Sequence, residues 1–178
     1  HNAYSFICWC KQEFSQSNFK IVYAGTSICF DLSIFEIFYP LSIGRSLRVI
    51  ESGLSIREYL LEDTNVLINS VPSIIQSLVN DFTDFKNIRV LNMAGEPIPL
   101  QVQQALDGDK IEIRNLYGPT EDTTYSTVHR LKNGEPATIG RPISNTNICI
   151  VNNEMELVPI GHIVEICIGG SGVAGGFL

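Results

Sequence analysis

The chain has 178 residues, of which 44% are hydrophobic and 17% are charged, a composition that supports a buried core and excludes a disordered chain. Its 12 Lys and Arg against 19 Asp and Glu give a formal charge of −7, which argues against a nucleic-acid partner. No apolar run is long enough to span a membrane and no signal peptide is visible, so we expect a cytoplasmic protein without a membrane partner. The sequence opens on His1 and ends on Leu178 without a polar tail, and we expect truncation at both ends.

Short apolar strands alternate with amphipathic helices through the first 130 residues. The first helix begins near Asp31, and its apolar face is predicted to comprise Ile34, Phe35, Ile37, Phe38 and Leu41. Ser55 to Glu58 has the pattern of a capping box that opens the next helix. Repeated strand–helix–strand units predict an α/β fold, a mostly parallel sheet with flanking helices. The predicted strands are 21–24, 47–50, 66–69, 88–93 and 111–115, and the helices are 31–43, 55–61, 72–79 and 100–106.

The pattern changes after residue 130. Asn133-Gly134 and Asn152-Asn153 indicate turns, strands are predicted at 147–151 and 164–168, and no helix is evident. We therefore predict an α/β subdomain at residues 1–130, followed at 131–178 by the start of a small β-barrel-like subdomain.

The five cysteines and three histidines lack the spacing of a zinc or redox site. Cys29, Cys149 and Cys167 lie inside apolar runs, which predicts buried, reduced thiols.

The segment Asn115-Leu116-Tyr117-Gly118-Pro119-Thr120-Glu121 follows a predicted strand and combines several kinds of chemistry. Gly-Pro predicts a tight turn. Around that turn, Tyr117 offers a ring for stacking on a base, Thr120 a hydroxyl for a phosphate, and Glu121 a carboxylate for a hard cation such as Mg²⁺. Open parallel sheets bind ligands beyond the carboxyl ends of their strands, so this segment predicts a nucleotide site. For the Tyr-Gly-Pro triplet alone, an ordinary turn would be the simpler interpretation.

With four further motifs in order, this segment resembles the adenylate-forming superfamily, specifically the adenylation domains of nonribosomal peptide synthetases. The resemblance covers essentially the whole chain. It implies an AMP-forming ligase that uses ATP and Mg²⁺ to activate an amino acid and then loads it on the phosphopantetheine of a peptidyl carrier domain beside other synthetase domains. The four motifs are Phe30-Asp31-Leu32-Ser33, Ala94-Gly95-Glu96-Pro97, Ile139-Gly140-Arg141-Pro142, and Glu165 to Ala174.

The resemblance implies roles for the matching residues. Asn115 and Tyr117 would hold the edge and the face of adenine, and Gly95 and Glu96 would line its pocket through their backbone. The cofactor-binding positions as a set are Gly95, Glu96, Asn115, Tyr117, Gly118 and Thr120.

Thr120 and Glu121 are the predicted catalytic residues. By resemblance, Thr120 would lie near the α-phosphate and Glu121 would be the Mg²⁺ ligand. The family's Lys-containing phosphate loop, its ribose-binding aspartate and its C-terminal domain with a catalytic lysine have no counterpart in this sequence. We therefore expect the 178 residues alone not to adenylate a substrate.

Asp31 has two possible roles. It could cap the helix that follows, the commonest use of Asp before an apolar periodic run. It could instead wait for a cationic ligand, because a carboxylate among apolar neighbours is costly unless it is paired. In the family the matching acid binds the α-ammonium of the amino acid substrate, and the motif favours this second role.

The resemblance also transfers the positions that select the substrate side chain. Phe35, Leu116 and Tyr125 are bulky, and Asp31 is the only charged residue in the set, so we predict a small, uncharged substrate. The combination is similar to that of alanine-activating modules such as those of microcystin-type synthetases, with glycine and serine as competitors. The positions are Asp31, Leu32, Phe35, Asn69, Asn92, Ala94, Leu116, Thr124 and Tyr125.

Two residues depart from the family's pattern. Val164 stands where the family usually has Gly, and Gly175 stands where it usually has Arg. Two alternatives therefore stay open: an acyl- or aryl-CoA ligase of the same superfamily, and a degenerate domain that only binds nucleotide or acts as a scaffold. Asp31 argues against the first, and the two departures support the second.

Overall fold

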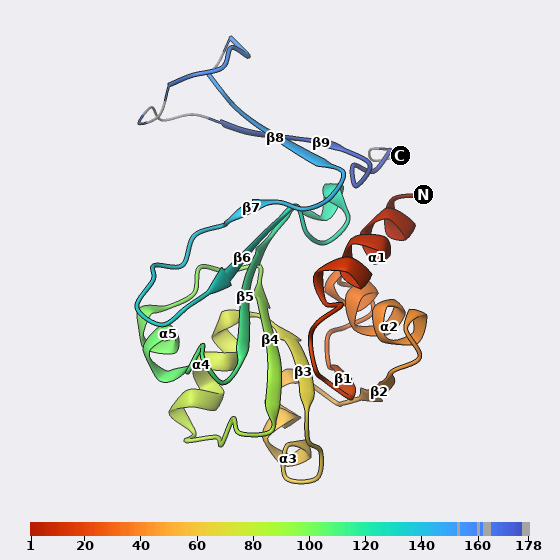
Figure 1. Ribbon diagram of the computed structural model, residues 1–178, viewed down its shortest axis with the longest axis vertical. Coiled ribbons are helices and arrows are strands. Elements are labelled where there is room, and N and C mark those ends of the chain that lie inside the picture. The colour runs from red at the N-terminus through yellow and green to blue at the C-terminus, as the bar shows by residue number, and fades with distance from the viewer. Residues whose placement is uncertain (153, 160, 162–164, 176–178) are drawn as a thin grey trace.

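A seven-stranded sheet forms the centre of the molecule, as seen in the computed structural model (Figure 1), which describes residues 1–152, 154–159, 161 and 165–175. The strand order is β2-β1-β3-β4-β5-β6-β7, with β1 to β5 parallel and β6 and β7 antiparallel. The predicted mostly parallel sheet is confirmed. The strands are β1 (Ile21–Ala24), β2 (Ser46–Val49), β3 (Val66–Ser70), β4 (Ile88–Ala94), β5 (Glu112–Tyr117), β6 (Thr127–Leu131) and β7 (Arg141–Pro142).

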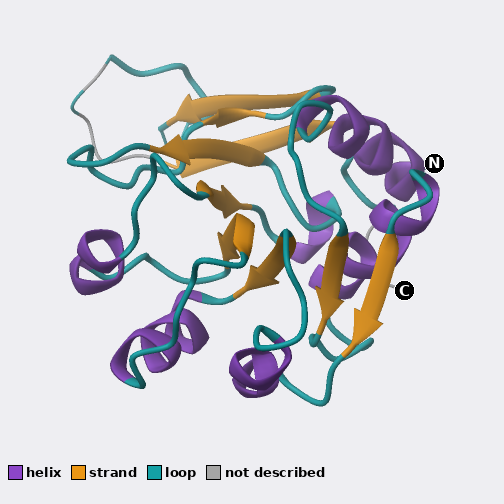
Figure 2. Cartoon of the chain, turned by 60° about the horizontal axis from the view of Figure 1, so that its bottom comes forward, coloured by secondary structure: helices purple, strands orange, loops and turns teal. Residues whose placement is uncertain are grey.

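Helices cover both faces of this sheet (Figure 2). One core contains Leu91 and Met93 of β4 together with α3, α4 and α5, and the other contains Val90 and Ala94 of the same strand together with α1 and α2. Because both faces are covered, the inner strands are apolar almost throughout instead of alternating with polar residues. The helices are α1 (Asn2–Glu13), α2 (Leu32–Ser42), α3 (Ile56–Tyr59), α4 (Pro72–Asn80) and α5 (Leu100–Ala105), with short 3₁₀ turns η1 (Gly53–Ser55) and η2 (Thr120–Asp122).

Helix α1 and strands β6 and β7 were not among the predicted elements. In α1, Phe6, Trp9 and Cys10 are buried at helical spacing against the sheet. That spacing was readable in the sequence, but the helix has no acidic residue in its first turn and no side-chain cap to mark its start.

The buried face of α2 differs from the predicted one. Its buried positions include Leu32, Phe35, Glu36 and Tyr39, whereas Phe38 and Leu41 are each 58% exposed. The predicted face omitted Leu32 and Tyr39, and the helix instead turns toward the sheet a stripe that contains these two residues and the carboxylate of Glu36. The predicted helix at 55–61 is also shorter, because η1 precedes α3 and no capping bond from Ser55 forms.

Strands β8 (Thr146–Val151) and β9 (Glu165–Gly170) form a separate antiparallel hairpin that projects beyond the large sheet (Figure 1). Because β7 still belongs to the large sheet, the change of sheet falls between Pro142 and Thr146. The division into subdomains at residue 130 stays a prediction.

Cys149 and Cys167 lie directly opposite each other in the hairpin. The thiols are free, but Cys29 and Cys149 are exposed and Cys167 is half-buried. The prediction that these three are buried was therefore wrong: Cys29 lies in the exposed turn before α2, and the face of the hairpin that carries Cys149 and Cys167 has no covering layer among the described residues. None of the described helices is both long and apolar enough to cross a bilayer.

Candidate functional site

The turn after β5 depends on a close backbone approach at Gly118. A Cβ there would lie 2.6 Å from the backbone nitrogen of Ser126 and 2.8 Å from the Cα of Tyr125. The Ser126 N–H donates to the carbonyl of Tyr117 at 2.7 Å, which closes the turn. Glycine is therefore required at this position, and the ring of Tyr117 is held at the end of the sheet.

The turn η2 is fastened to the segment that follows β9. The Thr123 hydroxyl donates to the carbonyl of Gly172 at 2.6 Å, and the Ala174 N–H donates to the carbonyl of Glu121 at 2.7 Å. Thr123 adopts a positive φ of 53°, an uncommon conformation that these contacts hold in place. Two residues 49 positions apart in the chain, Thr123 and Gly172, are thereby held next to each other.

Asp122 is a buried carboxylate within this turn. Its Oδ2 accepts a hydrogen bond from the Ser126 hydroxyl at 2.6 Å, whereas its Oδ1 has no partner among the described residues. Burial raises the pKa of the Asp122 carboxyl, and the bond from Ser126 opposes that shift only in part.

The predicted nucleotide residues lie together at the carboxyl edge of the sheet. Ala94 pairs with Leu116, so Gly95 and Tyr117 leave adjacent strands side by side. Tyr117 is 36% exposed, and Gly95 has a φ of +86° that favours glycine.

The side chains of Asn115 and Glu96 are already engaged. The Asn115 amide donates to the carbonyl of Thr138 at 2.8 Å, and the Glu96 carboxylate accepts bonds from the N–H and hydroxyl of Ser73 at 3.0 Å each. Glu96 therefore stabilises the start of α4 and leaves its backbone at the edge of the site.

Glu121 can serve as a Mg²⁺ ligand. Its carboxylate is exposed and forms no hydrogen bond or ion pair within the described part of the chain, which contains no cluster of three or more potential metal ligands. Mg²⁺ usually takes one or two carboxylates together with substrate phosphates and waters, so a single exposed carboxylate beside Thr120 fits that ion.

Asp31 lies at the N-terminus of α2, yet its side chain makes no capping hydrogen bond. Its backbone carbonyl accepts a hydrogen bond from the Thr124 hydroxyl at 3.1 Å. The acid is half-buried and lies next to the chain that leaves the Tyr117 turn. Of its two possible roles, the helix cap is not formed.

The remaining residues predicted to select the substrate form one wall on the α1 and α2 side of the sheet. Asn69 and Asn92 are paired on β3 and β4, and the neighbouring pair Ala94 and Leu116 continues the wall onto β5. Phe35 of α2 closes the wall, since its ring centroid lies 6.0 Å from that of Tyr125. All the positions except Asp31 are buried: Leu32, Phe35, Asn69, Asn92, Ala94, Leu116, Thr124 and Tyr125.

A buried polar chain runs behind this wall, and the sequence analysis missed it. The Tyr125 hydroxyl donates to Oδ1 of Asn69 at 2.5 Å, and the Asn69 amide donates to Oε1 of Glu36 at 3.2 Å. Burial raises the pKa of the Glu36 carboxyl, while bonds from Thr26 and Asn69 act in the opposite direction. The signal was the stripe Leu32, Phe35, Glu36, Tyr39 at helical spacing, in which Glu36 was not expected because it is charged.

Asn92 is the other polar group of the wall. It is fully buried, and both atoms of its amide lack a partner among the described residues. Its hydrogen-bonding capacity is therefore free for a ligand or an ordered water.

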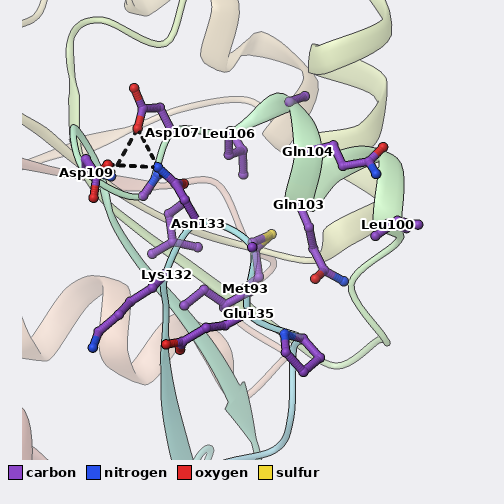
Figure 3. A pocket seen from close by; sticks show the side chains of 16 residues that line it. Met93, Leu100, Gln103, Gln104, Leu106, Asp107, Asp109, Lys132, Asn133 and Glu135 are labelled. Carbon is purple, nitrogen blue, oxygen red and sulfur yellow. Dashed lines mark hydrogen bonds between the residues drawn. The ribbon is translucent and has the colours of Figure 1, made fainter.

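Two cavities flank the sheet. One of about 190 Å³ lies at the carboxyl ends of β1 and β3 and includes Leu32 and Asn69 in its lining. A larger one of about 730 Å³ lies between α5 and the segment after β6 (Figure 3), where Asn133 bonds to Asp107 and Asp109. The larger cavity contains none of the predicted site residues, so the site does not lie there.

Of the two departures from the family's pattern, only Gly175 lies among the residues that the structure describes. Gly175 is exposed, and a Cβ at this position would meet no atom within 4 Å. Val164 lies outside the described residues.

Comparison with known proteins finds relatives that are named as synthases or synthetases. The chain is 41% identical over 179 residues to a linear gramicidin synthase of Brevibacillus parabrevis, covering 98% of this chain and 3% of the relative. It is 37% identical over 182 residues to the AMB antimetabolite synthetase AmbB of Pseudomonas aeruginosa, covering 99% and 15%. The chain thus spans a small part of the curated relatives it matches.

Solved structures share the fold. A four-domain nonribosomal peptide synthetase, holo-AB3403 bound to AMP and glycine, superposes with a TM-score of 0.87 at 24% identity, covering 98% of this chain and 14% of that one. The O-succinylbenzoate coenzyme A synthetase MenE of Bacillus subtilis, in complex with ATP and magnesium, gives 0.85 at 15% identity, covering 98% and 38%. The model of the AMP-binding enzyme family matches residues 1–178, and the chain therefore belongs to that family.

Proposed function

We propose that the chain is the central part of an adenylation domain of a nonribosomal peptide synthetase, and that the parent protein activates alanine. In the parent, the alanine carboxylate attacks the α-phosphate of ATP, giving alanyl-AMP and pyrophosphate. The phosphopantetheine thiol of a peptidyl carrier domain then attacks the carbonyl carbon of alanyl-AMP, forming a thioester and releasing AMP. Cytoplasmic ATP would supply the reaction, and neighbouring synthetase domains would use the product.

The observation that carries the proposal is the position of Asp31. Its carboxylate makes no helix cap, and its backbone is bonded to Thr124 beside the buried wall. We take the substrate recess to lie between Asp31 and this wall, where a carboxylate would suit the ammonium of an amino acid and would have no corresponding role for a fatty or aryl acid.

The wall supports a small side chain. Phe35, Leu116 and Tyr125 are bulky and each is 2% exposed or less, so little volume is left beside them. The hydroxyl of Tyr125 donates to Asn69, so it has no free hydrogen to offer a polar substrate side chain. These features favour a methyl side chain over a charged or long one.

The residues of the edge would serve the nucleotide. Tyr117 would stack on adenine beside Gly95, Asn115 would contact the adenine edge, and Thr120 would bind the α-phosphate. Mg²⁺ held by Glu121 would neutralise phosphate charge. Most of the contribution of these groups is positioning and electrostatic stabilisation.

The test is amino-acid-dependent ATP–pyrophosphate exchange by the full-length parent. We expect exchange with alanine, weaker exchange with glycine and serine, and none with hexanoate or benzoate. Exchange with a carboxylic acid that lacks an amino group would favour the CoA ligase alternative. ATP binding by calorimetry without a response to any amino acid would favour the scaffold alternative, which the loss of the usual arginine at Gly175 supports.

A further inference from the structure

Glu36 is a fully buried carboxylate, 0% exposed, to which neither the nucleotide site nor the recess assigns a role. Its Oε2 accepts a hydrogen bond from the Thr26 N–H at 3.0 Å, and its Oε1 accepts from the Thr26 hydroxyl at 2.5 Å and from the Asn69 amide at 3.2 Å. These bonds explain how the core tolerates a carboxylate. They do not explain why one is present.

The carboxylate fixes the direction of the hydrogen bonds that follow it. An ionised carboxylate only accepts, so Asn69 turns its NH₂ toward Glu36 and its oxygen toward Tyr125. The oxygen of Asn69 can only accept, so the Tyr125 hydroxyl donates to it. One acid thereby sets the orientation of two residues of the recess wall.

The aromatic neighbours of Tyr125 hold its ring at the same time. Its centroid lies 5.5 Å from that of Phe6, 6.2 Å from that of Trp9 and 6.0 Å from that of Phe35. With its hydroxyl hydrogen-bonded to Asn69 and its ring enclosed, Tyr125 has no free hydroxyl donor.

We propose that Glu36 is a positioning residue that sets the substrate selectivity of this site, acting through Asn69 on Tyr125. The proposal rests on the proposed function, because it concerns the same recess. With Glu36 in place, the recess prefers a methyl group. Without it, Asn69 and Tyr125 are free to reorient, and the hydroxyl of Tyr125 becomes available to the hydroxyl of serine.

The experiment compares Glu36→Gln, Tyr125→Phe and the double variant in the full-length parent. Glutamine has one acceptor oxygen where glutamate has two, so one of the hydrogen bonds from Thr26 or Asn69 is lost while the volume of the side chain is unchanged. Tyr39→Phe is the matched control, since Tyr39 is also on α2, is 1% exposed and stacks on Phe35 at 5.2 Å, but lies outside the hydrogen-bonded chain.

We expect Glu36→Gln to lower the preference for alanine over serine, measured as the ratio of kcat/KM values, by about fivefold. The KM for ATP should stay within about twofold of the unmodified value, and Tyr39→Phe should leave the alanine-to-serine ratio unchanged. In the double variant the effect should be no larger than in one single variant, because residues that act in series are not additive.

Two results would overturn the proposal. One is a Glu36→Gln variant that loses the same factor in kcat/KM for every amino acid. The other is a double variant in which the two single effects multiply.

A parent without any amino-acid-dependent exchange would overturn the proposed function instead. The coupling of Glu36 to Tyr125 can then still be tested by measuring the midpoints of thermal unfolding of the two single variants and the double variant. Additive changes in these midpoints would reject the coupling.

Discussion

The hydroxyl of Thr124 donates to the backbone carbonyl of Asp31 at 3.1 Å, joining residues 93 positions apart in the chain. This bond fastens the start of α2 to the strand-turn unit that carries Tyr117 and Glu121. It brings the acid proposed for the substrate ammonium beside the residues proposed for the nucleotide. The two halves of the candidate site are thus connected by a hydrogen bond from a side chain to the backbone, independently of any ligand.

Replacing Asp31 with alanine should remove the response to amino acids and spare ATP. We expect the KM for alanine in the exchange assay to rise by at least about 30-fold, because loss of one partner from a desolvated charge pair costs about 2–5 kcal/mol. Asp84→Ala is a suitable control, since this aspartate is exposed and paired with Lys86 away from the site. An unchanged KM for alanine would mean that Asp31 does not bind the ammonium.

Gly118→Ala should destabilise the domain. The added methyl would meet the Ser126 nitrogen at 2.6 Å, and backbone atoms cannot move aside as a flexible side chain can. We expect a loss of about 1–3 kcal/mol in the free energy of unfolding, together with weaker ATP binding because Tyr117 shifts. Gly169→Ala is the matched control, as a Cβ there would meet no atom within 4 Å. Equal stability of the two variants in urea denaturation would contradict this account of the turn.

Asp122→Asn should change the pH dependence of stability. Burial raises the folded-state pKa of Asp122, so the stability it contributes is fully present below the unfolded pKa and is lost as pH rises through the folded value. As pH rises from the unfolded pKa through the folded pKa, the free energy of unfolding of the asparagine variant should therefore increase relative to that of the unmodified protein. The difference should persist at neutral pH.

Asp107→Asn provides a control of opposite sign. Lys110, helped by Asn133, lowers the pKa of Asp107 to about 2, so its contribution is present above the unfolded pKa and is lost as pH falls toward about 2. Denaturation curves from about pH 3 to about pH 8 would compare both variants. The same sign of pH dependence in both would show that burial does not govern Asp122.

Gly175→Arg should be tolerated and should improve the affinity for ATP. The position is open, and the family's pattern predicts a cation here on the nucleotide side; an exposed ion pair contributes up to about 1 kcal/mol, so the KM for ATP should fall by up to about fivefold. Gly175→Gln tests whether charge is the cause, since it adds length without charge. If both variants behave alike, or if neither changes the KM for ATP, the missing arginine has no role in nucleotide binding here.

The sheet and most of its helices were predictable because apolar periodicity is a local signal. The strand predicted at 21–24 coincides with β1, and those predicted at 66–69 and 88–93 match β3 and β4 to within one residue. Strands β6 and β7 were not predicted, because their apolar periodicity is weak or mixed with polar residues. The buried face of α2 was predicted wrongly because hydrophobicity alone cannot show that a carboxylate is satisfied by bonds from Thr26 and Asn69.

Long-range polar partners could not be predicted. Arg114 lies on β5 with no exposed surface, yet it pairs with Glu13 at 2.9 Å and with Glu112 at 3.1 Å, and it lies 4.3 Å above the ring of Phe14. Nothing near Arg114 in the sequence identifies α1 as its cover. The candidate site was found through its motifs, whereas the chain from Glu36 to Tyr125 needed three-dimensional contacts.

The bonds from Thr123 to Gly172 and from Ala174 to Glu121 couple the β8–β9 hairpin to the η2 turn, at the edge of the sheet proposed for the nucleotide. A displacement of the hairpin would be transmitted to the backbone of η2, the turn that carries Glu121. A neighbouring domain that binds the hairpin would thereby influence the position of Glu121, the proposed metal ligand, without contacting the buried wall.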